Sequence, residues 1–166
     1  MNKYDLLKEI THLNPKEHSI NSFLLTEETL QTLHGICCPK EGAKSYRTSD
    51  LSPTGKGHKP PHAEDIEHFM NHFIGQLETS LGLFHPVEFA AIAYKRFLDL
   101  SPFDSHNEET GALFLNVLLS SAGYPIIQNP VFLPGYAEAM EKARIMPFPD
   151  TDDLTSLIGD EILRLL

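Results

Sequence analysis

The side chains of this chain that are best suited to chemistry stand in one polar loop, residues 101–112. The loop reads Ser-Pro-Phe-Asp-Ser-His-Asn-Glu-Glu-Thr-Gly-Ala and is flanked on both sides by apolar segments with helical spacing. His106 is the one side chain of the loop that titrates near neutral pH, and Asp104 and Glu109 stand close to it in sequence. One interpretation of the loop is therefore a metal or acid–base cluster made by these three residues.

The same loop also suits a structural role, as the start of the second helix. Asn107 is a favourable N-cap residue, and Glu108 and Glu109 would then occupy the first helical turn. Carboxylates in that turn interact favourably with the helix dipole. The residues alone leave both interpretations open.

The rest of the chain consists mostly of segments that predict helices. Apolar residues recur at helical spacing, and residues such as Thr26, Gly35 and Pro86 supply start and stop signals. The segments with this pattern are residues 4–12, 26–35, 63–83, 85–100, 113–123, 134–143 and 152–166. We therefore predict an all-α bundle of six to eight helices.

One segment, residues 37–62, departs from the helical pattern. It is rich in Pro, Gly, Lys, Ser and Thr, and residues 45–48 have some strand character. Residues 51–57 supply turn chemistry before Pro60 and Pro61. We predict a loop or a small β-hairpin near residues 44–60.

Composition limits the function classes that this chain can serve. Its 166 residues, 41% of them hydrophobic, suit a single domain over residues 1–166. A formal charge of −10 opposes non-specific binding to nucleic acid and to anionic membranes. The sequence shows no membrane span, and its first ten residues lack the apolar core of a signal peptide, so we expect a cytoplasmic protein.

Histidine and cysteine residues give no recognised metal pattern. The adjacent Cys37 and Cys38 are too few for a zinc site and poorly placed for a structural disulfide, which predicts reduced thiols. Four histidines cluster in the middle of the chain, but without the glutamate spacing of a zinc protease. They are His58, His62, His68 and His72. We expect surface histidines and predict no metal site.

The loop and its surroundings resemble a known family. Residues 101–109 resemble a degenerate form of the motif HPFx[DE]GNGR of the Fic/Doc (Fido) family, and the apolar stretch that follows ends in Ala-Gly-Tyr-Pro, as the family's does. Residues 85–100 resemble the helix that precedes the motif. Ser45-Tyr-Arg47, followed by glycines and Pro60-Pro61, resembles the family's flap hairpin.

The resemblance covers residues 43–166 and implies a Fic-type helical bundle with a flap. Residues 1–42 would then form an N-terminal helical extension. The resemblance further implies a bacterial-type Fic domain and AMPylation, the transfer of AMP from ATP to a protein hydroxyl.

The family's division of labour implies a role for each motif position. Its histidine is the base for the target hydroxyl, its acidic residue holds Mg²⁺, its glycines and asparagine form an anion-binding turn, and its arginine binds the outer phosphates. In this sequence Ser101 takes the position of the base and Ser105 that of the metal ligand, with Asp104 one residue early. His106 takes the position of the first glycine, and Asn107 is kept.

Glu108 and Glu109 stand where the family has its second glycine and its arginine. Two unit charges about 4 Å apart interact by roughly 4 kcal/mol at an effective dielectric constant of ~20, so the reversed sign turns attraction for phosphate into repulsion. Loss of a general base commonly slows a reaction by ~10²–10⁴. We therefore expect a pseudoenzyme that no longer binds ATP and Mg²⁺ in the family's manner.

Two functions follow from the resemblance. The first is a Fic-fold protein, inactive or impaired in AMP transfer, that binds a protein or a small ligand in the old cleft. The alternative is a divergent nucleotidyl or phosphoryl transferase with a relocated base or another donor. In either case the flap could dock a target protein through Ser45, Tyr46, Arg47 and Thr48, with Asn107 facing the ligand.

Overall fold

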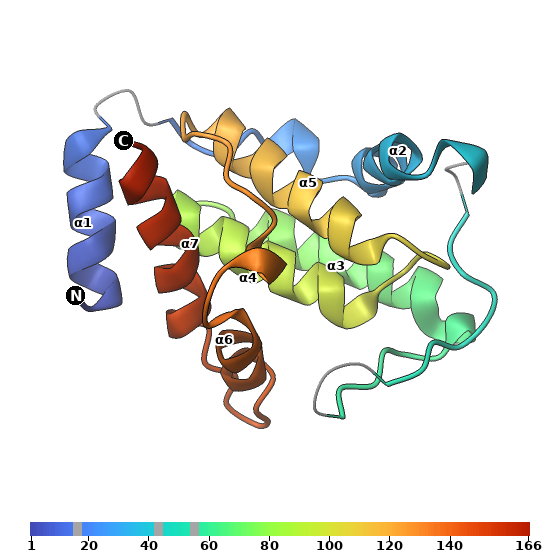
Figure 1. Ribbon diagram of the computed structural model, residues 1–166. Coiled ribbons are helices and arrows are strands. Elements are labelled where there is room, and N and C mark those ends of the chain that lie inside the picture. The colour runs from blue at the N-terminus through green and yellow to red at the C-terminus, as the bar shows by residue number, and fades with distance from the viewer. Residues whose placement is uncertain (15–17, 42–44, 54–56) are drawn as a thin grey trace.

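The computed structural model describes residues 1–14, 18–41, 45–53 and 57–166. Within them lie seven α-helices and four short 3₁₀ turns, which confirms the prediction of an all-α fold. The helices, shown in Figure 1, are α1 (Lys3–Leu13), α2 (Glu27–Cys37), α3 (Ile66–Ser80), α4 (Pro86–Leu100), α5 (Asn107–Ser121), α6 (Tyr136–Ala143) and α7 (Asp152–Leu165). None of these helices combines the length and the apolar character that crossing a membrane requires.

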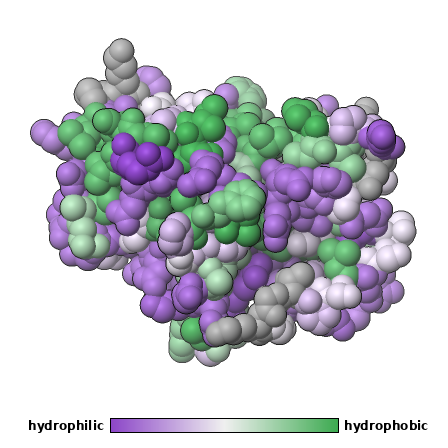
Figure 2. Space-filling view, in the orientation of Figure 1, coloured by the Kyte–Doolittle hydropathy of each residue, from purple (hydrophilic) through white to green (hydrophobic). Residues whose placement is uncertain are grey.

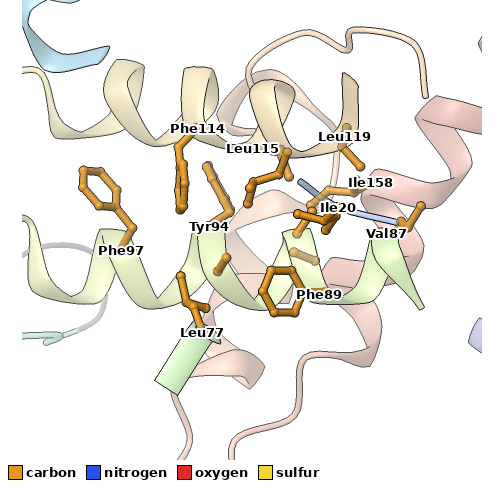
Figure 3. Close-up of a cluster of buried hydrophobic side chains, with 14 of the residues drawn as sticks. Ile20, Leu77, Val87, Phe89, Tyr94, Phe97, Phe114, Leu115, Leu119 and Ile158 are labelled. Carbon is orange, nitrogen blue, oxygen red and sulfur yellow. The ribbon is translucent and has the colours of Figure 1, made fainter. Parts of the chain in front are cut away.

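Helices α4 and α5 form the centre of the bundle. Tyr94 and Phe97 point from α4 toward α5, and Phe114 points back between them (Figure 3). All three side chains are fully buried, and the ring centroids of Phe97 and Phe114 lie 6.4 Å apart. Because α4 also packs against α3 and α7, it is covered on several sides, and the loop that follows it starts from a rigid element.

The outer helices enclose this pair. α1 packs along α7 at one end of the molecule, while α2 lies over α5 at the other (Figure 1). Hydrophilic side chains cover much of the face drawn in Figure 2, and hydrophobic ones gather toward its upper left, where α1 and α7 end. Lys3 fastens α1, since its Nζ lies 2.6 Å from Glu88 of α4 and 2.7 Å from Asp152 of α7.

Sequence signals place the helix boundaries well. Thr26 caps α2 by accepting a hydrogen bond from Thr29, as predicted, although the helix runs two residues beyond Gly35. Pro86 is the first residue of α4, and the side chain of His85 accepts the N–H of Val87. The predicted helix over residues 63–83 is shorter than expected, because a 3₁₀ turn occupies its first three residues and α3 ends at Ser80.

The predicted β-hairpin near residues 44–60 is the main difference from the sequence-based expectation. The described part of this segment, residues 45–53 and 57–60, contains no strand and only an isolated bridge residue, His58. The backbone of Arg47 donates to the carbonyl of Pro102 instead, at 2.8 Å, so it hydrogen-bonds to the motif loop rather than to a second strand. The rest of the predicted hairpin, residues 44 and 54–56, lies outside the described residues.

Two glycines give a matched test of this packing. A Cβ at Gly159 of α7 would lie 2.9 Å from Cδ2 of Leu6, which is itself buried, whereas a Cβ at Gly75 of α3 meets nothing within 4 Å. We expect G159A to lower the free energy of unfolding by about 1–3 kcal/mol through overpacking. G75A should raise it by roughly 0.5–1 kcal/mol, because alanine is the better helix former.

Chemical denaturation of both variants measures the two effects. An unchanged or more stable G159A would mean that α1 does not pack on α7 as described.

Candidate functional site

The loop between α4 and α5 holds two residues in a backbone conformation that side chains seldom adopt. Ser101, at the end of α4, has φ of 41°, and His106, just before α5, has φ of 60°. They are the two non-glycine residues with positive φ in the described chain. The resemblance predicts a glycine of the family's motif at position 106, and a positive φ is a conformation that glycine adopts without strain.

Asn107 closes the loop, but not as the N-cap that the sequence predicts. It is the first residue of α5, and His106 precedes it without a side-chain capping bond. The side chain of Asn107 instead pairs with the backbone of Phe103. Its Oδ1 accepts the N–H of Phe103 at 3.0 Å, and its Nδ2 donates to the carbonyl at 2.9 Å. The amide therefore fixes the loop from within.

Phe103 anchors the loop in the core. Its side chain is fully buried, and the ring of His34 stacks on it with centroids 3.9 Å apart and planes 7° from parallel. Nε2 of His34 also donates to the carbonyl of Ser105 at 3.1 Å. Sequence reasoning missed His34, because its only signal was a histidine beside the leucines of α2.

Arg47, predicted as a target-binding residue, lies inside the protein. Only 2% of it is exposed, and its guanidinium donates to backbone carbonyls of four residues. Three of these bonds span segments far apart in sequence, to Ser101 at 2.7 Å, Leu100 at 3.2 Å and Pro61 at 2.6 Å. Since Leu100 and Ser101 end α4, Arg47 satisfies carbonyls that the helix leaves open.

The other predicted flap residues are more accessible. Ser45 and Thr48 are exposed, and Tyr46 is half-buried. Tyr46 donates its hydroxyl to Glu27 of α2, and burial, together with this carboxylate, raises the pKa of the phenol. Ser45 and Thr48 therefore remain the side chains of this segment that a partner could reach.

A large cleft opens beside the start of α5. Its volume is about 1160 Å³, and its walls come from the motif loop, from Leu51 and residues 57–59, and from residues 131–145 around α6. Of the predicted motif-loop site residues, five line it, and Asp104 and Ser105 do not. The five are Ser101, His106, Asn107, Glu108 and Glu109. Sequence reasoning did not anticipate the opposite wall, which includes Tyr136, Glu138 and Glu141.

The charge of the cleft is negative. Glu108 and Glu109 face it from α5, and Glu138 and Glu141 from α6. The cationic side chains among the described lining residues are Lys59 and Arg144, and Nε of Arg144 lies 2.6 Å from the carboxylate of Asp99. The cleft is therefore suited to a cationic or neutral occupant rather than to a polyphosphate.

The hydroxyl and imidazole of the loop are engaged locally. Ser101 Oγ donates to the carbonyl of Leu98 at 2.6 Å, and a hydroxyl has no pKa near neutrality. Nδ1 of His106 lies 2.8 Å from Ser105 Oγ, and its Nε2 lies 3.7 Å from a carboxylate oxygen of Glu109. Ser101 and His106 thus both have polar partners close by in the chain.

The cluster of Asp104, His106 and Glu109 is only partly brought together. His106 meets Glu109, but Asp104 does not line the cleft. Across the described residues no three side chains of His, Cys, Asp or Glu come close enough to hold a metal ion.

These features agree with the comparison to known proteins. The model of the Fic/DOC family matches residues 24–119, more than half of the chain and the whole of the motif loop. The chain therefore belongs to the Fic/DOC family.

Similar curated proteins carry the name "Protein adenylyltransferase Fic". The one from Aedes aegypti is 43% identical over 116 residues, which are 66% of this chain and 22% of that protein. The one from Nematostella vectensis is 38% identical over 92 residues, 55% of this chain and 21% of its own. The chain spans about a fifth of the length of these relatives.

Solved structures show the same fold. A Fic domain containing signaling protein from Bacteroides thetaiotaomicron has a TM-score of 0.64 at 19% identity, covering 97% of this chain and 62% of that one. The BepC protein of Bartonella tribocorum, solved with bound AMPPNP, has a TM-score of 0.63 at 18% identity, covering 95% and 82%. These similarities establish the helical Fic fold.

The backbone at His106 gives the second prediction. A left-handed conformation costs a residue with a Cβ roughly 1–2 kcal/mol, and glycine avoids that cost. We expect H106G to be more stable than H106A by about 1 kcal/mol, because both variants lose the imidazole but only glycine relieves the backbone. For a chain of this length the difference corresponds to roughly 2–4 °C in Tm.

Thermal unfolding of the two variants measures this difference. Equal Tm values would show that residue 106 does not hold a positive φ.

Proposed function

We propose that this chain is a Fic-domain protein with a degenerate active-site loop, inactive or impaired in AMP transfer, that acts by binding a protein or a ligand in its cleft. The observation that supports the proposal most is the charge of the cleft. Glu109 stands at the position of the phosphate-binding arginine and faces a cavity with three further glutamates, Glu108, Glu138 and Glu141.

The base and metal positions support the same proposal. Ser101 replaces the base and donates its hydroxyl to Leu98, so no proton acceptor stands at that position. Ser105 replaces the metal ligand, and neither it nor Asp104 lines the cleft. Because phosphoryl transfer depends on charge neutralisation and positioning, losing both contributions together removes the basis of the reaction. Mg²⁺ and ATP are accordingly not part of the proposed function.

The loop's shape is kept while its chemistry changes. The side-chain amide of Asn107 pairs with the backbone of Phe103, and Arg47 binds the carbonyl of Ser101 at the end of α4. A cleft with a rigid wall and a volume of about 1160 Å³ is large enough for a small ligand or a peptide side chain and its neighbours. Exposed Ser45 and Thr48 offer a contact for a protein partner beside it.

One observation favours the alternative, a divergent transferase that modifies a protein hydroxyl. His106 lies in the cleft and contacts Glu109, which could hold its imidazole as a relocated base. Such an enzyme would need a donor that tolerates the glutamates.

A transfer assay separates the two functions. The chain is incubated with Mg²⁺, labelled ATP, UTP or CDP-choline, and candidate protein substrates, beside an active Fic relative as positive control. We expect transfer at least ~10²-fold slower than in the relative, because the base position holds serine.

Label transfer at a comparable rate would overturn the proposal. If H106A then abolished that transfer while H106Q did not rescue it, His106 would be the relocated base of the alternative.

A further inference from the structure

A second cavity lies on the α3–α4 face of the protein, outside the motif loop. Its volume is about 400 Å³, and α3, α4 and residues 149–151 form its walls. The walls are mainly apolar, from Phe69 and Phe73 of α3, Ile92 of α4 and Pro149. A cavity of this size and lining is typical of sites for small molecules.

Arg96 of α4 brings a positive charge into this cavity. Its guanidinium makes no hydrogen bond or ion pair with any residue that the structure describes, and its central carbon lies 5.7 Å from the ring centroid of Phe73. Burial lowers the pKa of Arg96, since the charged form is partly removed from water. A half-buried guanidinium with five N–H donors favours an anionic partner.

Lys95 and Asp99 carry the other formal charges among the lining residues, and these two neutralise one another. Asp99 reaches Nζ of Lys95 at 2.7 Å with one carboxylate oxygen, and Nε of Arg144 at 2.6 Å with the other. Both oxygens of Asp99 therefore have closer partners than Arg96, which Asp99 attracts only at longer range. His72 and Thr151 complete the polar part of the wall.

We propose that this cavity binds an organic anion, a carboxylate or phosphate monoester carried on an aryl or alkyl body. The anion pairs with the guanidinium of Arg96, and the body lies against Phe69, Ile92 and Pro149. A planar guanidinium matches the two oxygens of such a group in a bidentate arrangement. The site is separate from the proposed function of the cleft, because none of its lining residues belongs to the motif loop.

The chain as a whole helps to make the test specific. Its formal charge of −10 disfavours scattered anion binding, so a saturable response to a small anion reports a particular site. Amide signals of Ile92 and Thr151 in ¹⁵N–¹H spectra of the full chain report on the two sides of the cavity.

The experiment titrates the ¹⁵N-labelled chain with 4-phenylbutyrate and phenyl phosphate, and with 4-phenylbutanol as the uncharged match. We expect saturable shifts of the Ile92 and Thr151 signals with the anions. Binding of the alcohol should be about tenfold weaker or more, since a charged hydrogen bond is lost.

The variant R96Q should weaken anion binding by a similar factor, while R164Q should leave it unchanged. Arg164 is the matched control because it lies on α7 and pairs with Glu161 at 2.6 Å, outside the cavity. Shifts that do not saturate, or equal binding of acid and alcohol by the unaltered chain, would overturn the proposal whether or not R96Q folds.

Discussion

The burial of Phe103 is the interaction on which the cleft side of this protein depends. The chain must reverse between α4 and α5 within six residues, and it does so through left-handed conformations at Ser101 and His106. Those conformations oppose folding, so the loop needs contacts that hold it. Phe103 supplies them by filling the space beneath the loop, with His34 stacked on its ring. The amide of Asn107 then closes the backbone around it.

Arg47 extends this arrangement to the segment before α3. Its guanidinium donates to carbonyls at the end of α4 and to the carbonyl of Pro61, and so joins three parts of the chain. All of these acceptors are backbone groups. Such contacts do not depend on which side chains face the cleft. The loop can therefore keep its shape while the side chains that face the cleft differ. Scaffold and chemistry are carried by different residues, and the proposed function depends on that separation.

The helices of the bundle could be predicted from the sequence because their signals are local. Apolar spacing, Thr26 and Pro86 mark helices that the structure confirms within a few residues. The loop could be predicted as a candidate site because its residue order resembles the family's motif. The resemblance to the family predicted that the loop lines a cleft. It did not predict that α6 forms the opposite wall.

The failures involve contacts that the sequence pattern does not record, most of them between distant segments. Residues 45–48 have strand character, but Arg47 is paired with the motif loop, and the sequence does not record that partner. Asn107 suits an N-cap, yet its amide finds the backbone of Phe103 four residues earlier. His34 lies about seventy residues from the loop that it stacks on, a distance at which only the fold itself gives the contact.

The most direct test of whether the cleft repels nucleotide phosphates is the binding of Mg·ATP. Isothermal titration calorimetry measures it for the unaltered chain and for the double variant E108G/E109R. The account predicts no measurable binding to the unaltered chain, because the carboxylates of the cleft repel the phosphates. The double variant, which restores a glycine and a positive charge, should gain affinity by about tenfold or more. Saturable binding of Mg·ATP to the unaltered chain, with an affinity equal to that of the variant, would contradict it.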